Sequence, residues 1–119
     1  MGNSIEDIQR LKAELRDCQK MLLALGNETR LYLLDILLSE DCKYGSRVWD
    51  IAQKTNLSRA AVSRHIQVLK AAGIIQSRKE GTHIYYYLDP EEEGFQKLVT
   101  MLTDAAQIAH NAPLREFED

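Results

Sequence analysis

The apolar positions near the start of the chain repeat at alternating steps of three and four residues, which is the spacing of the a and d positions of a heptad. Ser4 precedes this run as a candidate N-cap, and Gly26 follows it as a stop. The pattern predicts one helix with a single narrow apolar seam, formed by Ile8, Leu11, Leu15, Cys18, Leu22 and Leu25.

A broader apolar pattern follows Asn27, which is a candidate cap for a helix from Glu28 to about Ser39. The apolar residues of this stretch surround the helix instead of forming one stripe, so we expect it at the centre of the core. The polar stretch 39–46 predicts a loop, and its last residue, Ser46, is a candidate cap for the next helix.

Two further helical patterns, Arg47 to Thr55 and Arg59 to Ala72, are separated by a short connection. Asn56 tolerates the left-handed conformation that a tight turn needs, and Ser58 can cap the second helix. Together they predict a helix-turn-helix. In it Ala52 is small where the helices cross, Leu57, Val62, Ile66 and Leu69 point inward, and Arg59, Ala60, Ser63, Arg64, Gln67 and Lys70 point outward.

The segment after Gly73 changes to strand-like runs, Ile74 to Arg78 and His83 to Leu88, the second of which is rich in tyrosine. The residues between the runs include Gly81, which suits the positive φ of a hairpin turn. We therefore expect a β-hairpin, or wing, beside the helix-turn-helix.

The last periodic segment starts after Asp89-Pro90, at about Glu91, and ends before Pro113. Its apolar positions recur at helical spacing and again predict a helix with one apolar stripe. That stripe consists of Phe95, Leu98, Val99, Leu102, Ala105, Ala106 and Ala109.

These elements predict a mainly α, α+β fold, a winged helix-turn-helix in which four helices, two strands and a last helix form a single domain, 1–119. We assign 1–26 and 91–112 to dimerisation helices, 47–72 to the helix-turn-helix and 74–88 to the wing. The seams of the first and last helices have no other obvious partner in a chain this short, so we expect a homodimer. The candidate interface residues are Leu11, Leu15, Cys18, Leu22, Phe95, Leu98, Leu102, Ala105 and Ala109.

The chain carries a net charge of −3, but its charge is unevenly distributed. Residues 58–83 hold five cationic side chains against one acid, a net charge of +4, whereas residues 89–119 hold eight acids against two cations, a net charge of −6. A phosphate backbone meets the local basic face and not the global charge. The hydrophobic fraction of 45% and the charged fraction of 28% are typical of a folded globular chain.

The second helix of the predicted helix-turn-helix carries arginine and short polar side chains on its outward face. Arginine can bond bidentately to guanine. We expect this helix to read double-stranded DNA at a pseudo-palindromic operator, with the wing cations on phosphates or in a minor groove. A merely solvated basic face and a module that binds protein are the alternatives, although a protein-binding face favours aromatic anchors. The candidate DNA contacts are Ser58, Arg59, Ala60, Ser63, Arg64, Gln67, Lys70, Arg78, Lys79, Thr82 and His83.

The amino-terminal residues include Glu6 and Asp7, where a secretory signal would be basic and then apolar. Apolar runs stay well short of the roughly 20 residues of a membrane span, and Cys18 and Cys42 form neither a CxxC pair nor a disulfide framework. We therefore expect a cytoplasmic protein with no membrane partner. The histidines join no nucleophile or carboxylate in a catalytic motif, so neither an enzyme nor a cofactor is predicted.

Three stretches resemble the signatures of the ArsR/SmtB family of arsenic- and metal-responsive repressors. Residues 24–31 read ALGNETRL, residues 57–75 read LSRAAVSRHIQVLKAAGII, and residues 78–88 read RKEGTHIYYYL. The resemblance spans about Met21 to Ala109. It implies a homodimer held by its first and last helices, DNA recognition through the second helix-turn-helix helix, and release from DNA when an effector binds.

The metal ligands of that family are missing at the matching positions. The Cys-Val-Cys-Asp motif of metal-sensing relatives aligns with Arg47-Val48-Trp49-Asp50, which holds neither thiolate. His110 has only Asp104 as a neighbouring candidate, nearly on the opposite face of a helix. We therefore expect no metal at the usual family sites. The zinc ligands of the last helix in relatives align with Phe95, Lys97, Ile108 and Asn111.

The identity of the effector is therefore left open. Two alternatives to a ligand-responsive repressor are a constitutive repressor and a repressor that responds to thiol oxidation. Cys18 occupies a seam position, where a small buried hydrophobe is favoured over a sensor. Cys42 lies beside Lys43 in the predicted loop, a neighbour that favours a thiolate.

Overall fold

The computed structural model describes residues 2–39, 44–89 and 91–113. Its elements follow the predicted order, with one additional helix because the first predicted helix is divided in two. They are α1 (Ile5–Asp17), α2 (Gln19–Leu25), α3 (Glu28–Ser39), α4 (Val48–Gln53), α5 (Arg59–Ala71), β1 (Gln76–Glu80), β2 (His83–Tyr87) and α6 (Glu93–Asn111).

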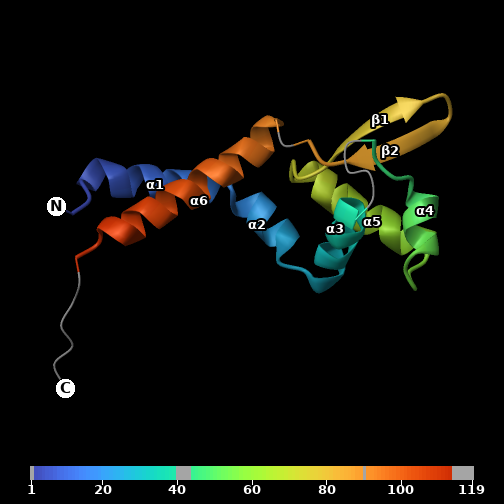
Figure 1. Cartoon of the computed structure of the whole chain (residues 1–119), viewed down its shortest axis with the longest axis horizontal. Coiled ribbons are helices and arrows are strands. Elements are labelled where there is room, and N and C mark those ends of the chain that lie inside the picture. The colour runs from blue at the N-terminus through green and yellow to red at the C-terminus, as the bar shows by residue number, and fades with distance from the viewer. Residues whose placement is uncertain (1, 40–43, 90, 114–119) are drawn as a thin grey trace, which may run out of the picture.

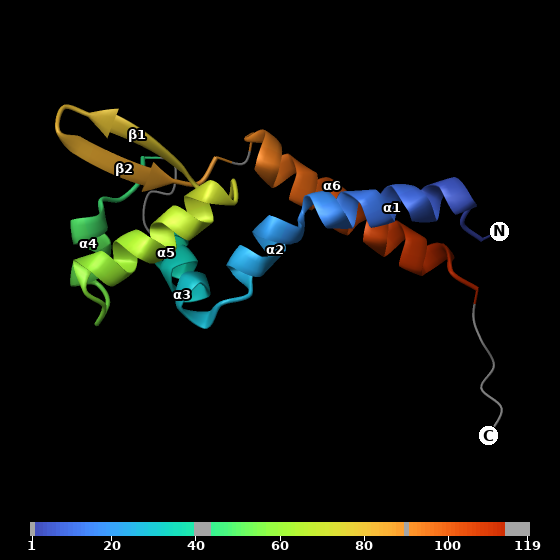
Figure 2. The same cartoon turned by 180° about the vertical axis from the view of Figure 1, so that it is seen from behind.

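The elements form two groups at opposite ends of the molecule (Figure 1). Helices α1 and α6 pack together at one end, while α3, α4, α5 and the β1–β2 hairpin lie at the other, and Figure 2 shows the same division from behind. The molecule measures 60 × 33 × 21 Å and its radius of gyration is 18.3 Å, against about 13 Å for a compact domain of roughly 100 residues. A single chain therefore leaves much of the α1 and α6 pair uncovered.

The first predicted helix is divided at Cys18, which ends α1 and precedes α2. Helix α1 packs against α6, whereas α2 packs against α3 and α5. The prediction of one continuous helix was wrong because its two halves have different packing partners. Heptad spacing reports which residues share a face and not where the helix changes direction.

Three of the predicted caps are confirmed. The Ser4 hydroxyl accepts the Asp7 backbone N–H at 3.0 Å, the Asn27 side-chain carbonyl accepts that of Arg30 at 3.0 Å, and the Ser58 hydroxyl accepts that of Ala61 at 3.1 Å. Each bond satisfies a backbone donor that has no partner within its helix.

Ser46 does not cap α4, contrary to prediction. The N-cap is Arg47, whose backbone N–H donates to the Asp50 carboxylate at 3.4 Å. Ser46 instead exchanges two backbone hydrogen bonds of 2.9 Å with Tyr86, so it extends the hairpin sheet by one bridge. The backbone of Ser46 is thus committed to the wing.

The turn of the helix-turn-helix forms without a left-handed residue. Among the described residues only glycines have positive φ, so Asn56 does not take the conformation expected of it. The Thr55 hydroxyl accepts the Leu57 backbone N–H at 3.2 Å and stabilises the turn instead. Leu57 packs against the core, as predicted.

The core lies mainly between α3, α4 and α5, and α2 and α6 add Met21, Ala24 and Met101 to it. It includes Ile51 of α4 and the predicted inward face of α5, and it closes over Ile74 and Ile75 before the hairpin begins. Helix α3 contributes Leu33, Leu34 and Leu37, which confirms its central place, but its Leu31 and Leu38 are exposed in the single chain.

Strands β1 and β2 pair antiparallel from Gln76 opposite Tyr87 to Glu80 opposite His83. The turn places Gly81 at φ +61°, as predicted, and an added Cβ would meet no neighbour there. Strand β1 starts two residues later than expected, and the preceding Ile74 and Ile75 are buried in the core. No helix in the described part of the chain has the length and apolar character needed to cross a membrane.

Candidate nucleic-acid interface

Helix α5 has one buried and one exposed face. Val62, Ile66 and Leu69 are completely buried, so the rotation of the helix about its axis is fixed by the core. The predicted outward residues lie on the opposite side: Ser58, Arg59, Ala60, Arg64, Gln67 and Lys70 are exposed, and Ser63 is half-buried.

The wing is attached to the middle of α5. The Gln67 side-chain amide donates to the Tyr86 hydroxyl at 3.2 Å, and the Tyr86 side chain is buried. Because Tyr86 also pairs with Ser46, the hairpin is connected both to α5 and to the segment before α4. The exposed face of α5 and the wing therefore form one surface with fixed relative positions. Of the predicted wing contacts, Lys79, Thr82 and His83 are exposed.

Arg78 is held among three tyrosines instead of pointing freely into solvent. Its guanidinium carbon lies 4.7 Å from the ring centre of Tyr44, 5.0 Å from that of Tyr85 and 5.8 Å from that of Tyr87. Its Nη1 donates to the Tyr44 backbone carbonyl, and its Nε donates to Glu80 at 3.1 Å. These contacts stabilise the guanidinium where it is. Sequence reasoning missed Tyr44, whose contact with the hairpin depends on tertiary structure.

A cleft of about 220 Å³ opens between the wing and the first residues of α4 and α5. It brings together Arg59, Thr82 and His83, which the sequence had placed among the DNA contacts. It adds Arg47 and Trp49, which sequence reasoning had considered only as substitutes for metal ligands. In the sequence, a cation close to an aromatic residue at the start of the helix before α5 could have indicated that these two residues belong to the site.

Arg30 of α3 connects that helix to α2 and α5. Its Nε donates to the Ala24 carbonyl at 2.6 Å, and its Nη1 lies 3.4 Å from Nδ1 of His65 on α5. Burial, with Arg30 and Arg64 nearby, lowers the pKa of His65. His65 is therefore neutral at physiological pH and packs inward instead of contributing charge to the surface.

The predicted dimerisation residues differ in their exposure within the single chain. Leu15 and Leu102 are 49% and 55% exposed and lie on uncovered surface of α1 and α6. Cys18 is buried within its own chain, so its thiol is not on that surface. Leu11, Leu22 and Leu98 pack partly against the core of the same chain, Phe95 and Ala105 are half-buried, and Ala109 is exposed.

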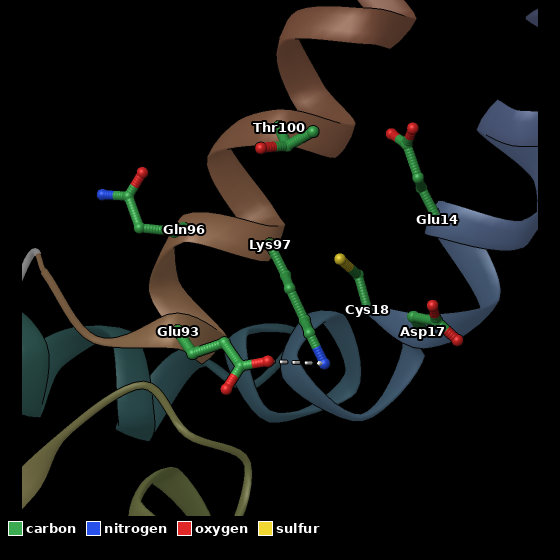
Figure 3. Close-up of a pocket in the computed structure, with 7 residues that line it drawn as sticks. All are labelled: Glu14, Asp17, Cys18, Glu93, Gln96, Lys97 and Thr100. Atoms are coloured by element: carbon green, nitrogen blue, oxygen red, sulfur yellow. Dashed lines mark ion pairs between the residues drawn. The ribbon is translucent and has the colours of Figure 1, made fainter.

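A cleft of about 280 Å³ lies between α1 and α6, and Figure 3 shows the Cys18 thiol pointing from the junction of α1 and α2 toward α6. Lys97 pairs with Glu93 at 3.7 Å on its edge. Burial and the neighbouring Asp17 and Glu14 carboxylates raise the pKa of Cys18, so its neutral thiol is favoured. Cys42, the other candidate thiol, lies outside the described residues.

Among residues 2–39, 44–89 and 91–113, no three His, Cys, Asp or Glu side chains gather into a group that could hold a metal ion. Arg47 and Trp49 occupy the start of α4, where the sequence comparison looked for thiolates. The expectation that the usual metal sites are unused stays a prediction that metal titration must test.

The sequence profile of the bacterial regulatory proteins of the arsR family matches residues 27–77, from the cap of α3 into β1. The transcriptional repressor SdpR of Bacillus subtilis (strain 168) is 36% identical over 66 residues, which cover 56% of this chain and 69% of SdpR. The transcriptional activator HlyU of Vibrio cholerae is 28% identical over 86 residues, which cover 72% of this chain and 76% of HlyU.

Among solved structures, the chain is similar to the homodimeric winged helix-turn-helix DNA-binding domain of a protein from Mycobacterium bovis, a possible ArsR-family transcriptional regulator. The two chains are 27% identical, the match covers 99% of each, and the TM-score is 0.59. The similarity therefore includes the α1 and α6 pair as well as the helix-turn-helix and the wing.

Proposed function

Because the chain belongs to the ArsR family of DNA-binding transcription regulators, which are not enzymes, we propose that it is a homodimeric repressor that binds a pseudo-palindromic operator. Its two α5 helices enter successive major grooves, which requires half-sites about one helical turn apart. The effector, if there is one, is not a metal bound at the usual family sites.

The observation that carries this proposal is the surface shared by α5 and the wing. The apolar side of α5 is completely buried, so its polar and cationic side chains face outward in one fixed orientation. The bond between Gln67 and Tyr86 holds the wing beside them. The proposed DNA contacts are Ser58, Arg59, Ala60, Ser63, Arg64, Gln67, Lys70, Arg78, Lys79, Thr82 and His83.

Arg78 is the member of this set whose guanidinium is already engaged. To reach a phosphate it must leave Glu80 and its tyrosine neighbours, or bind DNA through the one side of the guanidinium that they leave open. Lys79 next to it is exposed and forms no ion pair within the described part of the chain. We therefore assign the main phosphate contact of the hairpin to Lys79.

The dimer is proposed to form through α1 and α6, with residues 1–26 and 91–112 as its dimerisation helices, 47–72 as the helix-turn-helix and 74–88 as the wing. Both helices leave large apolar side chains uncovered in the single chain, which a monomer exposes at a cost. These are Ile5, Ile8 and Leu15 on α1, and Val99 and Leu102 on α6. The similarity to the homodimeric Mycobacterium bovis domain supports a dimer, though not a particular interface.

The direction of regulation and the effector are separate parts of the proposal. SdpR is a repressor and HlyU an activator, so similarity alone fits either direction. We favour repression because a bare winged helix-turn-helix dimer can block a promoter by occupying it, without any surface for polymerase. A buried thiol with a raised pKa is a poor oxidation sensor, which argues against Cys18 as the effector site.

The deciding experiment is a mobility shift on the DNA upstream of its own gene, followed by a reporter assay from the same promoter. We expect a saturable shift that competitor DNA of random sequence does not remove, and higher reporter output when the gene is deleted. Metals, thiol oxidants and reactive sulfur species are then added singly. A metal that binds stoichiometrically and releases the DNA would overturn the effector part of the proposal.

A further inference from the structure

The cleft between the wing and the starts of α4 and α5 has an unusual charge balance. Arg47, Arg59 and His83 line it together with the Thr82 hydroxyl and the Trp49 ring, and no acidic side chain does so. Within the described part of the chain neither arginine forms an ion pair, and the neighbouring Asp50 accepts the Arg47 backbone N–H. Two guanidinium groups thus face a cleft in which nothing neutralises them.

This arrangement contrasts with that of Arg78, a few residues away in the sequence of the wing. Arg78 has a carboxylate, a carbonyl and three aromatic rings around its guanidinium. The fold therefore satisfies one wing arginine internally while it leaves Arg47 and Arg59 available. Guanidinium groups beside a hydroxyl donor match the geometry and charge of a phosphate group.

We propose that this cleft binds one phosphate of the DNA backbone through Arg47 and Arg59, with Thr82 and His83 closing it from the wing. The inference rests on the proposed function, since it takes α5 to be the helix in the major groove. Backbone strands border that groove on both sides. A strand that passes between the N-terminal end of α5 and the wing must cross the mouth of the cleft.

The assignment separates two arginines that the sequence could not distinguish. Arg59 is a phosphate contact, which positions the protein without reading sequence, while Arg64 lies further along α5 and is left to read bases. Arg47 becomes a DNA contact outside the recognition helix and the wing. Trp49, which is 48% exposed, offers its ring to the sugar beside that phosphate.

The first test measures the salt dependence of DNA binding for Arg47→Gln and Arg59→Gln, with Lys12→Gln on α1 as the control for the loss of one charge. Because both arginines bind the same phosphate, the double variant is expected to lower the slope of log affinity against log salt by about 1, and each single variant by part of that. Wild-type affinity should then fall about 3-fold to 4-fold more than that of the double variant between 50 and 200 mM salt. The loss should be equal on operator and random DNA, and Arg47→Lys should restore the slope.

Unchanged slopes in a variant that still binds DNA would overturn the inference and leave the proposed function intact. If wild-type protein binds no DNA, the proposed function itself fails. Arg59 is exposed on α5, so its variant remains informative even if Arg47→Gln proves unstable in thermal unfolding.

The second test identifies the phosphate and its source. Neutral methylphosphonates are placed one at a time along the bound duplex, and one position is expected to weaken wild-type binding clearly more than Arg47→Gln binding, which keeps only the Arg59 contact. Inorganic phosphate alone is titrated against the DNA-free protein by NMR, and we expect only weak binding in the millimolar range. Tight binding of free phosphate that releases DNA would overturn the assignment to the backbone, as would an Arg47→Gln variant that responds to every methylphosphonate as the wild type does.

Discussion

Arg59 and Arg64 are both exposed on α5, but only Arg59 shares a cleft with the wing. Arg64 is free to meet base edges, and an arginine bonded bidentately to guanine contributes about 1–3 kcal/mol of discrimination. We predict that Arg64→Ala loses about this much on the operator and distinctly less on random DNA. Mobility shifts on both duplexes at one salt concentration measure the difference. Equal losses would make Arg64 a backbone contact.

Arg78 connects the hairpin to the segment before α4, so its removal should affect folding more than that of its neighbour. We predict that Arg78→Ala lowers the free energy of unfolding by about 1–2 kcal/mol, through lost cation–π contacts and the lost bond to the Tyr44 carbonyl. Lys79→Ala should change it by less than about 0.5 kcal/mol. Urea unfolding at one fixed protein concentration makes the comparison.

In DNA binding the order should be reversed, with a larger effect for Lys79→Ala than for Arg78→Ala. Lys79→Ala should weaken binding to all sequences and lower the salt slope, because an exposed cation on the wing is lost. If Arg78→Ala were as stable as Lys79→Ala and lowered the slope as much, Arg78 would be a DNA contact and not a structural tie.

At the scale of the elements, α1 and α6 meet at a pair of carboxyl groups. The Asp104 carboxyl raises the pKa of Glu14, because it hydrogen-bonds to the protonated form of Glu14 and because its charge disfavours a second negative charge nearby. Burial also raises this pKa, whereas the positive charge of Arg10 lowers it. Arg10 lies 3.6 Å from Glu14 and 3.9 Å from Asp104. Ionisation of Glu14 therefore costs free energy at this contact between the two helices.

The sign of the pH dependence follows from that raised pKa. At pH values between the unfolded-state pKa of Glu14, 4.5, and its raised folded-state pKa, the folded chain binds more protons than the unfolded chain. The free energy of unfolding therefore falls as the pH rises through this interval. We predict that Glu14→Gln removes this fall and is more stable than the wild type at pH 7, while the difference shrinks toward pH 4. Urea unfolding at several pH values tests it, and a difference that did not vary with pH would contradict it.

Sequence periodicity identified most elements because it reflects which side chains are buried. Val62, Ile66 and Leu69 followed directly from it, whereas the caps at Asn27 and Ser58 followed from the residue types that helix N-termini prefer. The exceptions depend on contacts between distant segments. Cys18 divides a helix because its halves pack on different partners.

The same limit applies to the candidate site. The exposed residues of α5 and the wing tip could be named from the sequence, because outward positions follow from the inward ones. The role of Arg78 could not, since Tyr44 lies far from it along the chain and reaches it only through the folded hairpin. Arg47 and Arg59 likewise line the same cleft only in the folded domain, so their proximity could not be read from the sequence.

At the scale of the whole molecule, the two ends have different requirements. The end that holds α5 and the wing contains most of the buried core, whereas the α1 and α6 end exposes apolar side chains and gives the chain its extended shape. A second copy placed on this end would bury those side chains and set the distance between the two α5 helices. Operator spacing would then be determined by residues remote from the DNA.

The dimer can be tested without disturbing the protomer, because Leu102 is 55% exposed in the single chain. We predict that Leu102→Asp, which would bury an unpaired charge in each half of the interface, yields a monomer in sedimentation. Gln107→Asp, which adds the same charge at an exposed polar position of α6, should remain dimeric. Since the two half-sites must be bound together, operator affinity of the monomer should fall by about 100-fold or more, with binding to a single half-site largely retained. A monomeric wild type, or a Leu102→Asp variant that stays dimeric with full operator affinity, would show that the partner copy does not pack on this face.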